Sequence, residues 1–462
     1  MKSNTPLILI NAVGLTRRWL DDAPVLASLA ESGWVSTLKE VLPAVTCTAQ
    51  ASILTGKSPQ EHGIVANGWL FRDTMEVRFW QQSNHLMQAE PFYVTAKKEA
   101  DKEGRRFRCA KLFWWFNQGA DVDFSITPKP HYGADGNKAF GISGQPDGLC
   151  EGIERAIGKF PFPSFWGPKS GIKSTAWIAQ CAAKVVRDHQ PELTLVYLPH
   201  LDYEPQRRGP SGCDMKAQVM QLDDSLQPLV EAAGKIGARI WVVSEYGHCD
   251  VDRPVFLNRE LRKAGWLQVR LGPFGEQLET FASDAIAVCD HQLAHVYIRK
   301  PELVSTIRDR LASIAGVDRA LMGAERAAIG LDHPRSGEII LLSKPNAWFA
   351  YPFWLEDKLA PDYARCIDIH RKPGFDPCEL FFDPKLLWPM GRAMRRLTQK
   401  KLGFRTLFDV IPLDASLVRG SHGLAAGHEY DRPVLIGDGP SPGSEMSMLG
   451  VREVVLSALR DG

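Results

Sequence analysis

The hydrophobic and polar positions of this 462-residue chain alternate between short apolar runs and longer amphipathic stretches. Nearly continuous apolar runs predict buried strands within residues 6–15, 192–203 and 238–250. Residues 23–33 and 215–237 have apolar positions at helical spacing and end on a glycine, which predicts two helices. Apolar strands that alternate with amphipathic helices are typical of a parallel sheet that is covered on both faces.

A different pattern interrupts this alternation in the second half of the chain. Residues 281–345 contain strand-like runs at "AHVYIRK" and "SGEIILLS" around two helical stretches, which predicts a small inserted α+β lobe. We therefore expect the core in residues 1–280, the lobe in residues 281–345 and a return to the core in residues 346–462. The fold class is α/β, with a mostly parallel central sheet flanked by helices.

The composition is that of a globular protein, with 44% hydrophobic and 24% charged residues. A net charge of +1 gives no overall field that would attract nucleic acid or an anionic membrane. No apolar stretch approaches the roughly 20 residues that span a bilayer. Nine cysteines are dispersed without a CxxC pair, which favours reduced thiols and a cytoplasmic location. We predict a small phosphorylated molecule as the partner, and neither a nucleic acid nor a membrane.

Several clusters of polar side chains, most of them at strand ends, can be set beside one another. The candidates are Thr46, Asn67, Asp202, Glu245 and His422. Because ligands bind at the carboxyl ends of parallel strands, we expect these side chains around one pocket. A hydroxyl, an amide, carboxylates and an imidazole suit the metal-assisted hydrolysis of a tetrahedral ester. The metal lowers the hydroxyl pKa, and the metal and the amide neutralise charge that develops on the equatorial oxygens.

The segment around Thr46 resembles a known family. In the nucleotide pyrophosphatase/phosphodiesterase branch of the alkaline phosphatase superfamily, a nucleophilic Thr is followed by Thr-Gly and then by Pro-x-x-His-Gly-Ile-x-x-Asn. This chain has Thr46, then "TG" at residues 55–56 and "PQEHGIVAN" at residues 59–67, in the same register. The resemblance implies an alkaline-phosphatase-like fold and a hydrolase of phosphodiesters or phosphoanhydrides. It also implies Thr46 as the nucleophile and Asn67 as the amide that holds the oxyanion.

The metal ligands of this family are only partly present. Asp202 and His422 match the Asp and the late His of one site, whereas Gln206 stands where that site has a second His. At the other site, Glu245 replaces an Asp. The resemblance therefore implies one divalent metal ion (Zn²⁺, Mn²⁺ or Mg²⁺) rather than two. Its implied ligands are Asp202, Gln206, Glu245 and His422. The chain also resembles a divergent bacterial subfamily of this branch.

The second metal site has lost two further ligands, because Val13 replaces an Asp and Tyr246 replaces a His. Side chains elsewhere could replace the missing ligands, and the sequence leaves five of them open. These are Asn11, His200, His248, Asp368 and His370.

Each candidate also has a simpler explanation. Thr46 could only cap the helix that follows, Asn67 could be a turn residue, and Asp202 could be a loop acid. His291 and His295 are interpreted as lobe histidines rather than ligands. Two alternative functions stay open on the same scaffold. The first is a phosphomonoesterase or phosphonate hydrolase, and the second is a pseudoenzyme that binds a ligand or partner without turnover.

Overall fold

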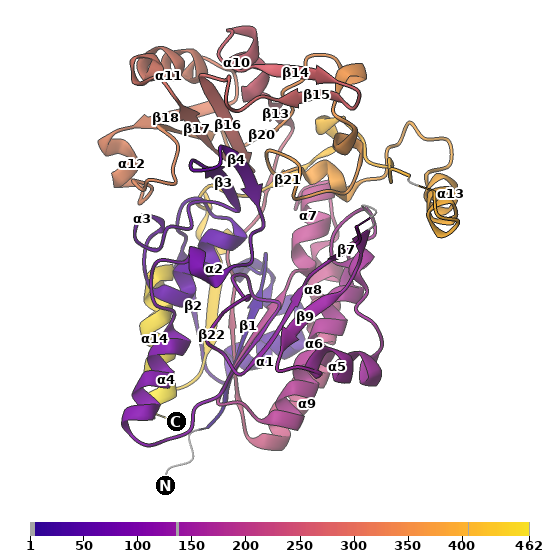
Figure 1. The fold of residues 1–462 in the computed structure, drawn as a ribbon. Helices are drawn as coiled ribbons and strands as arrows, with labels where there is room; N and C mark the ends of the chain where they lie inside the picture. The colour runs from indigo at the N-terminus through magenta and orange to yellow at the C-terminus, as the bar shows by residue number, and fades with distance from the viewer. Residues whose placement is uncertain (1–4, 135–137, 405, 462) are drawn as a thin grey trace.

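The computed structural model describes residues 5–134, 138–404 and 406–461, and its core is a nine-stranded sheet (Figure 1). The strands lie in the order β23 (Glu445–Ser447), β2 (Trp34–Lys39), β22 (Val434–Gly437), β11 (Arg239–Val243), β1 (Leu7–Ala12), β10 (Leu193–Leu198), β5 (Cys109–Leu112), β6 (Phe124–Pro128) and β9 (Ile142–Gln145). From β11 to β6 the strands are parallel, whereas β22 and β9 are antiparallel to their neighbours. The predicted mostly parallel sheet is therefore confirmed.

Helices cover both faces of the sheet, because its central strands are apolar on both sides. Leu7 and Leu9 of β1 face one layer of helices, and Ile8 and Ile10 face the other. The first layer contains α2 (Thr46–Thr55), α4 (Phe92–Lys102) and α14 (Val451–Asp461). The second contains α1 (Pro24–Glu31), α5 (Leu149–Ile157), α6 (Ile172–His189), α8 (Met215–Ser225) and α9 (Gln227–Ile236). Figure 1 shows the two layers on opposite sides of the sheet.

Two predicted elements differ from the structure. Residues 215–237 form the separate helices α8 and α9, with a proline in the first turn of α9. A proline lacks the amide hydrogen and clashes with a preceding turn, so it starts a helix more easily than it continues one. The predicted strand over residues 238–250 ends at Val243, and residues 244–248 form a loop. This loop carries several of the candidate residues.

A second, antiparallel sheet forms the inserted lobe. Its strands lie in the order β16 (Ala285–Asp290), β17 (Leu293–Ile298), β19 (Ile339–Ser343) and β18 (Val317–Met322). The helices and hairpin packed near it are α10 (Leu257–Lys263), α11 (Val304–Ala312), α12 (Ala324–Ala328), β14 (Val269–Gly272) and β15 (Gly275–Leu278). The apolar core of the lobe extends from Val255 to Ala364. The domain limits at residues 281 and 345 stay a prediction.

Short strand pairs and helices complete the described structure. The pairs are β3 (Gly68–Phe71) with β4 (Glu76–Phe79), β7 (His131–Tyr132) with β8 (Lys138–Ala139), β12 (Cys249–Asp250) with β21 (Gly420–Ser421), and β13 (Arg253–Val255) with β20 (Ala347–Phe349). Further helices are α3 (Pro59–His62), α7 (Tyr203–Arg208) and α13 (Pro389–Lys401). Among the described residues, no helix has both the length and the apolar character needed to cross a bilayer.

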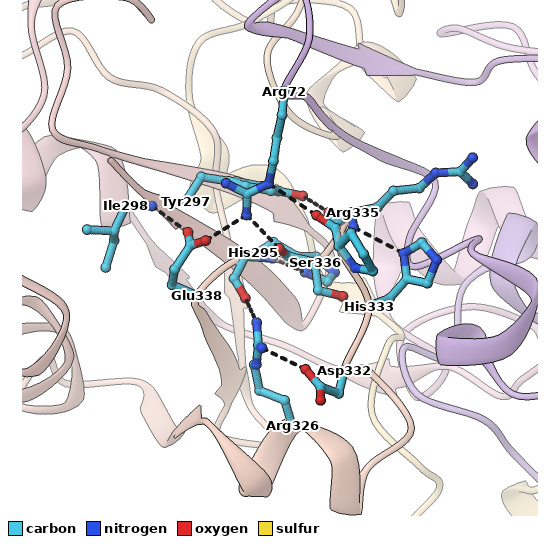
Figure 2. Close-up of polar contacts among 12 residues, drawn as sticks. Arg72, His295, Tyr297, Ile298, Arg326, Asp332, His333, Arg335, Ser336 and Glu338 are labelled. Atoms are coloured by element: carbon cyan, nitrogen blue, oxygen red, sulfur yellow. Dashed lines mark hydrogen bonds and ion pairs between the residues drawn. The ribbon is translucent and has the colours of Figure 1, made fainter. Parts of the chain in front are cut away.

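Polar contacts join the lobe to residues 63–72 of the core, and Figure 2 shows those of Arg72. From the lobe, the Arg335 guanidinium donates to the carbonyl oxygen of Gly63 at 2.7 Å. From the core, Arg72 forms an ion pair with Glu338 of the lobe at 2.7 Å. The middle of this core segment carries one of the predicted catalytic residues, so the lobe takes part in holding that residue in place.

Candidate active site

Thr46 is the first residue of α2, and its hydroxyl faces a tyrosine. Its Oγ1 lies 2.9 Å from the hydroxyl oxygen of Tyr246, and the residue is 3% exposed. The N-cap of α2 is Val45, which makes no side-chain capping bond. The contact with Tyr246 therefore distinguishes Thr46 from a residue that only caps its helix.

Tyr246 connects Thr46 to Asp202. The phenolic oxygen lies 3.3 Å from Asp202 Oδ1, and a carboxylate oxygen only accepts hydrogen bonds. The single phenolic hydrogen therefore goes to Asp202, and Thr46 donates its hydrogen to the phenolic oxygen. Burial, followed by the charge of Asp202, raises the pKa of Tyr246 well above its usual value, so the phenol keeps its hydrogen. This arrangement leaves the lone pairs of Thr46 Oγ1 available to an electrophile.

Asp202 also lies beside two histidines, and the three side chains form a candidate metal site. Their ligating atoms all lie within 4.8 Å of one another. From Asp202 Oδ1, the Nε2 atoms of His248 and His422 are 3.0 Å and 3.7 Å away. Burial alone would raise the pKa of Asp202, but the hydrogen bond from His248 and the proximity of both imidazoles outweigh burial and lower this pKa. The carboxylate is therefore ionised at neutral pH, as a metal ligand must be.

The backbone explains why these two histidines meet. β12 pairs with β21 in antiparallel fashion, with Cys249 opposite Ser421. The residue before Cys249 and the residue after Ser421 are therefore neighbours, and they are His248 and His422, with ring centroids 5.3 Å apart. A glycine lets this pair approach α7 closely, because a Cβ on Gly420 would lie 2.0 Å from a backbone oxygen of that helix.

His422 presents a nitrogen that can accept a cation. Its Nδ1 lies 2.8 Å from the carbonyl oxygen of Ala44, so Nδ1 carries the hydrogen and Nε2 keeps its lone pair. Nε2 is buried and has no hydrogen-bond partner in the part of the chain that the structure describes. Burial, and then the neighbouring His291, lowers the pKa of His422 well below its usual value, so the ring stays neutral. A buried lone pair beside an ionised carboxylate fits a divalent cation.

Glu245 lies close to Thr46 and accepts hydrogen bonds from two side-chain amides. Its Oε1 accepts hydrogen bonds from the side-chain amides of Asn11 and Gln50, the latter at 2.7 Å. Burial raises the pKa of Glu245 to about 8, so the carboxyl holds a proton at neutral pH. A neutral carboxyl that already accepts from two amides is a poor ligand for a cation. The two amide bonds favour a structural role for Glu245, whereas its Oε2 is buried with no hydrogen-bond partner among the described residues. Its role as a metal ligand therefore stays a prediction.

Replacing Glu245 by glutamine tests the structural role. Between pH 4.5 and 8 the folded protein holds a proton that the unfolded chain has released, so the stability of the wild type falls as the pH rises through this window. Glutamine has no proton to hold and keeps the oxygen that accepts both bonds. Glu245→Gln is therefore expected to stabilise the fold at pH 8 by on the order of 3 kcal/mol, and much less near pH 4.

The measurement is urea unfolding of both proteins across that pH range, without added metal. Glu231→Gln, on an exposed position of α9, is the matched control and should leave the pH dependence of stability unchanged. If Glu245→Gln and the wild type lose stability in parallel as the pH rises, the claim that Glu245 is protonated at neutral pH is wrong. The metal content of both proteins is measured separately, and a loss of bound metal in Glu245→Gln would support Glu245 as the predicted ligand.

The side chain of Asn67 contacts the first turn of α2, and a residue of the lobe holds it there. Its Oδ1 accepts a hydrogen bond from the backbone amide of Cys47 at 2.9 Å. Asp290, the last residue of β16, accepts from the backbone amide of Asn67 at 2.7 Å and from Nδ2 at 3.1 Å. Because Nδ2 carries two hydrogens, one is left for a ligand. Asp290 was not among the residues predicted from the sequence, where its only signal is an acid at the end of the apolar run "AIAVCD".

The remaining candidate ligands are a glutamine in α7 and three residues that do not belong to the Asp202–His248–His422 cluster. Gln206 is fully buried in α7, four residues after Asp202, and stays a candidate for a further ligand. His200 is buried but does not belong to the cluster. Asp368 pairs with a neighbouring arginine at 3.4 Å. His370 lines a cavity of about 580 Å³ that none of the cluster residues borders.

A family model described as type I phosphodiesterase / nucleotide pyrophosphatase matches residues 7–376, well over half of the chain. The matched range includes Thr46, Asp202 and His248, whereas His422 lies beyond it. No curated protein matches the chain.

Solved structures of two kinds resemble the chain over almost its whole length. Phosphonoacetate hydrolase from Sinorhizobium meliloti 1021, in complex with phosphonoformate, has a TM-score of 0.61 and 16% identity, and the match covers 99% of this chain and 96% of that chain. Murine ectonucleotide pyrophosphatase/phosphodiesterase 5 has a TM-score of 0.58 and 13% identity, with 98% and 95% covered. An inactive threonine-to-alanine form of the murine protein in complex with AMP has the same TM-score of 0.58 and identity of 13%, with 99% and 95% covered. These similarities show an alkaline-phosphatase-like fold.

Proposed function

Because the chain belongs to the type I phosphodiesterase and nucleotide pyrophosphatase family, we propose that it hydrolyses a phosphodiester or phosphoanhydride with Thr46 as the nucleophile. The chain is a hydrolytic enzyme of the phosphodiesterase and pyrophosphatase type, as the family is. The roles of individual residues rest on the contacts around Thr46.

One observation carries this proposal: the Thr46, Tyr246 and Asp202 side chains form a continuous hydrogen-bonded line beside two histidines. A threonine is a weak nucleophile until a neighbouring group orients or deprotonates its hydroxyl. Tyr246 orients it by accepting its hydrogen, which turns the lone pairs of Oγ1 towards the substrate. The inactive threonine-to-alanine form of the murine relative supports a threonine in this role.

Two features beside Thr46 can receive the negative charge of the phosphoryl group. Asn67 has a free Nδ2 hydrogen at the start of α2, which suits an equatorial oxygen of the transition state. The N-terminus of α2 adds partial positive charge from its unpaired backbone amides. Asp290 keeps Asn67 in this orientation, so it acts as a positioning residue.

Asp202, His248 and His422 would hold one divalent cation, because they offer an ionised carboxylate and two imidazoles. When bound, such a cation lowers the pKa of the attacking hydroxyl and neutralises charge on the phosphoryl oxygens. The two imidazoles make the ligand set rich in nitrogen, which favours Zn²⁺ over Mg²⁺ or Mn²⁺. The hydrogen-bonded Glu245 and the apolar Val13 leave the second site of the family without its ligands.

The charge of the site favours a diester over a monoester. Within the described residues, the hydrogen bonds and ion pairs of Thr46, Asn67 and Asp202 include no Lys or Arg side chain. One cation and one amide can balance the single charge of a phosphodiester better than the double charge of a phosphomonoester. The substrate is therefore expected to carry one negative charge at the phosphorus that Thr46 attacks.

The proposal is tested with three substrates in the presence of Zn²⁺, Mn²⁺ or Mg²⁺: bis-p-nitrophenyl phosphate, p-nitrophenyl phosphate and phosphonoacetate. We expect the diester to be hydrolysed at least roughly tenfold faster than the monoester, in keeping with one unit of unbalanced charge. A faster monoester or phosphonoacetate reaction would assign the site to the corresponding alternative. If no substrate is turned over with any cation, the proposal is wrong and the pseudoenzyme alternative is favoured.

A further inference from the structure

Helix α13 stands apart from the body of the protein (Figure 1). Its ion pairs lie on one side of the helix. Arg392 and Arg396 both pair with Asp409, and the distance from Arg396 Nε to Asp409 Oδ1 is 2.9 Å. Because successive residues of a helix are rotated by about 100°, Met394 and Leu397 lie on the opposite side. Both are exposed, so this side of α13 has little covering it within the described structure.

Exposed apolar side chains are concentrated on α13 and its flanks. In the part of the chain that the structure describes, 16 large apolar side chains are exposed, and half of them lie within residues 387–407. The most exposed of these are Leu387, Trp388, Met394, Leu397, Leu402 and Phe404. Single exposed apolar residues are ordinary, whereas a contiguous group of them marks an interaction surface.

The same segment is strongly basic. Residues 385–401 contain six Lys and Arg residues and no Asp or Glu, although the net charge of the whole chain is only +1. Asp409 balances Arg392 and Arg396, while Lys385 and Arg395 are exposed. Basic residues around an apolar helix face, with a tryptophan at one end, are typical of a segment that lies in the interface of an anionic membrane.

We propose that α13 attaches this protein to the surface of an anionic lipid bilayer. The side chains of Trp388, Met394 and Leu397 enter the boundary between headgroups and acyl chains, and Lys385 and Arg395 contact lipid phosphates. The expectation that no membrane is a partner followed from the net charge of the whole chain, which averages out this local concentration of positive charge.

Two other occupants fit the surface less well. A second copy of the chain would place one basic segment against another, and like charges at an interface are repulsive. A groove on an acidic protein takes up a single stripe of a helix. Here exposed apolar residues also lie before and after the helix, at Leu387, Leu402 and Phe404. The apolar surface is therefore wider than one stripe, which suits a plane.

The test is flotation of the purified full-length chain with two kinds of vesicle, phosphatidylcholine alone and phosphatidylcholine with phosphatidylglycerol. We expect the wild type to float only with the anionic vesicles, and less so as the salt concentration rises. The double variant Met394→Gln/Leu397→Gln should bind at least roughly tenfold more weakly. Arg395→Gln should bind roughly fivefold more weakly.

The matched control is Met220→Gln/Leu271→Gln, which changes two exposed apolar residues outside this segment and should float like the wild type. The melting temperature and the rate of hydrolysis in solution should be unchanged in both double variants, which shows that they are folded. The proposal is overturned if the wild type does not float with anionic vesicles, or if Met394→Gln/Leu397→Gln floats equally well. A wild-type dimer that this variant converts to monomer, without flotation, would assign the surface to a second copy.

Discussion

Replacing Thr46 by alanine is expected to lower the rate of phosphodiester hydrolysis by roughly 10³-fold or more, while the fold survives. Alanine has no oxygen to attack phosphorus. The folded protein loses one buried hydrogen bond to Tyr246, at a cost of about 1 kcal/mol. Thr46→Ser keeps the oxygen and should retain a measurable fraction of the rate. It loses the methyl group that limits the χ1 rotamers, so its hydroxyl is less well oriented.

Rates and melting temperatures of both variants are measured together. Thr48→Ala is the matched control, because Thr48 is buried in the same helix and its hydroxyl has no hydrogen-bond partner among the described residues. It should keep nearly the full rate. Full activity in Thr46→Ala, with only a lowered melting temperature, would show that Thr46 serves the helix and not the reaction.

The fold could be predicted from the sequence because a strand that is buried on both faces appears as a nearly continuous apolar run. Strands such as β1 and β10 are mostly apolar and are buried at every position, and the amphipathic α6, α8 and α9 cover one face. Each of these elements is specified by residues close together in the sequence. The break between α8 and α9 was missed although its proline was visible, because the apolar spacing continues across it.

The candidate metal site was harder to predict, because it depends on a loop and on a pairing between distant segments. After β11 the chain leaves the extended conformation, so alternation no longer tells which of residues 244–248 face the site. The β12–β21 pair decides this by bringing His248 beside His422. The sequence named Asp202 and His422 as candidate ligands and left His248 open, and the structure brings all three together. It had no means of showing that Glu245 accepts bonds from Asn11 and Gln50.

The orientation of Asn67 also depends on a residue that is distant in the sequence. The family resemblance predicted Asn67 from its register after Thr46. The residue that orients it, Asp290, lies 223 positions further along the chain. Such a contact depends on how the lobe docks, through the Arg335 and Arg72 contacts, and no local pattern in the sequence records it.

We expect one divalent cation per chain, and we expect His422→Ala to lose it. The Nε2 lone pair of His422 has no other partner among the described residues, and its removal leaves two of the three clustered ligands. Affinity should fall by roughly 100-fold or more, and the rate of hydrolysis should fall with it. His248→Ala should have a similar effect. Gln206→Ala should have a smaller one, because a side-chain amide is not among the usual ligands of Zn²⁺.

Free ions are removed by gel filtration, and the metal content and the rate of hydrolysis are then measured for each variant. His200→Ala is the matched control, since His200 is a buried histidine of the same region that lies outside the cluster and should not be needed for binding. Two cations per wild-type chain would refute the single site and would mean that Glu245 gives up its amide partners to act as a ligand. A His248→Ala variant that keeps its cation while Gln206→Ala loses it would return the site to the ligand set that the sequence implied.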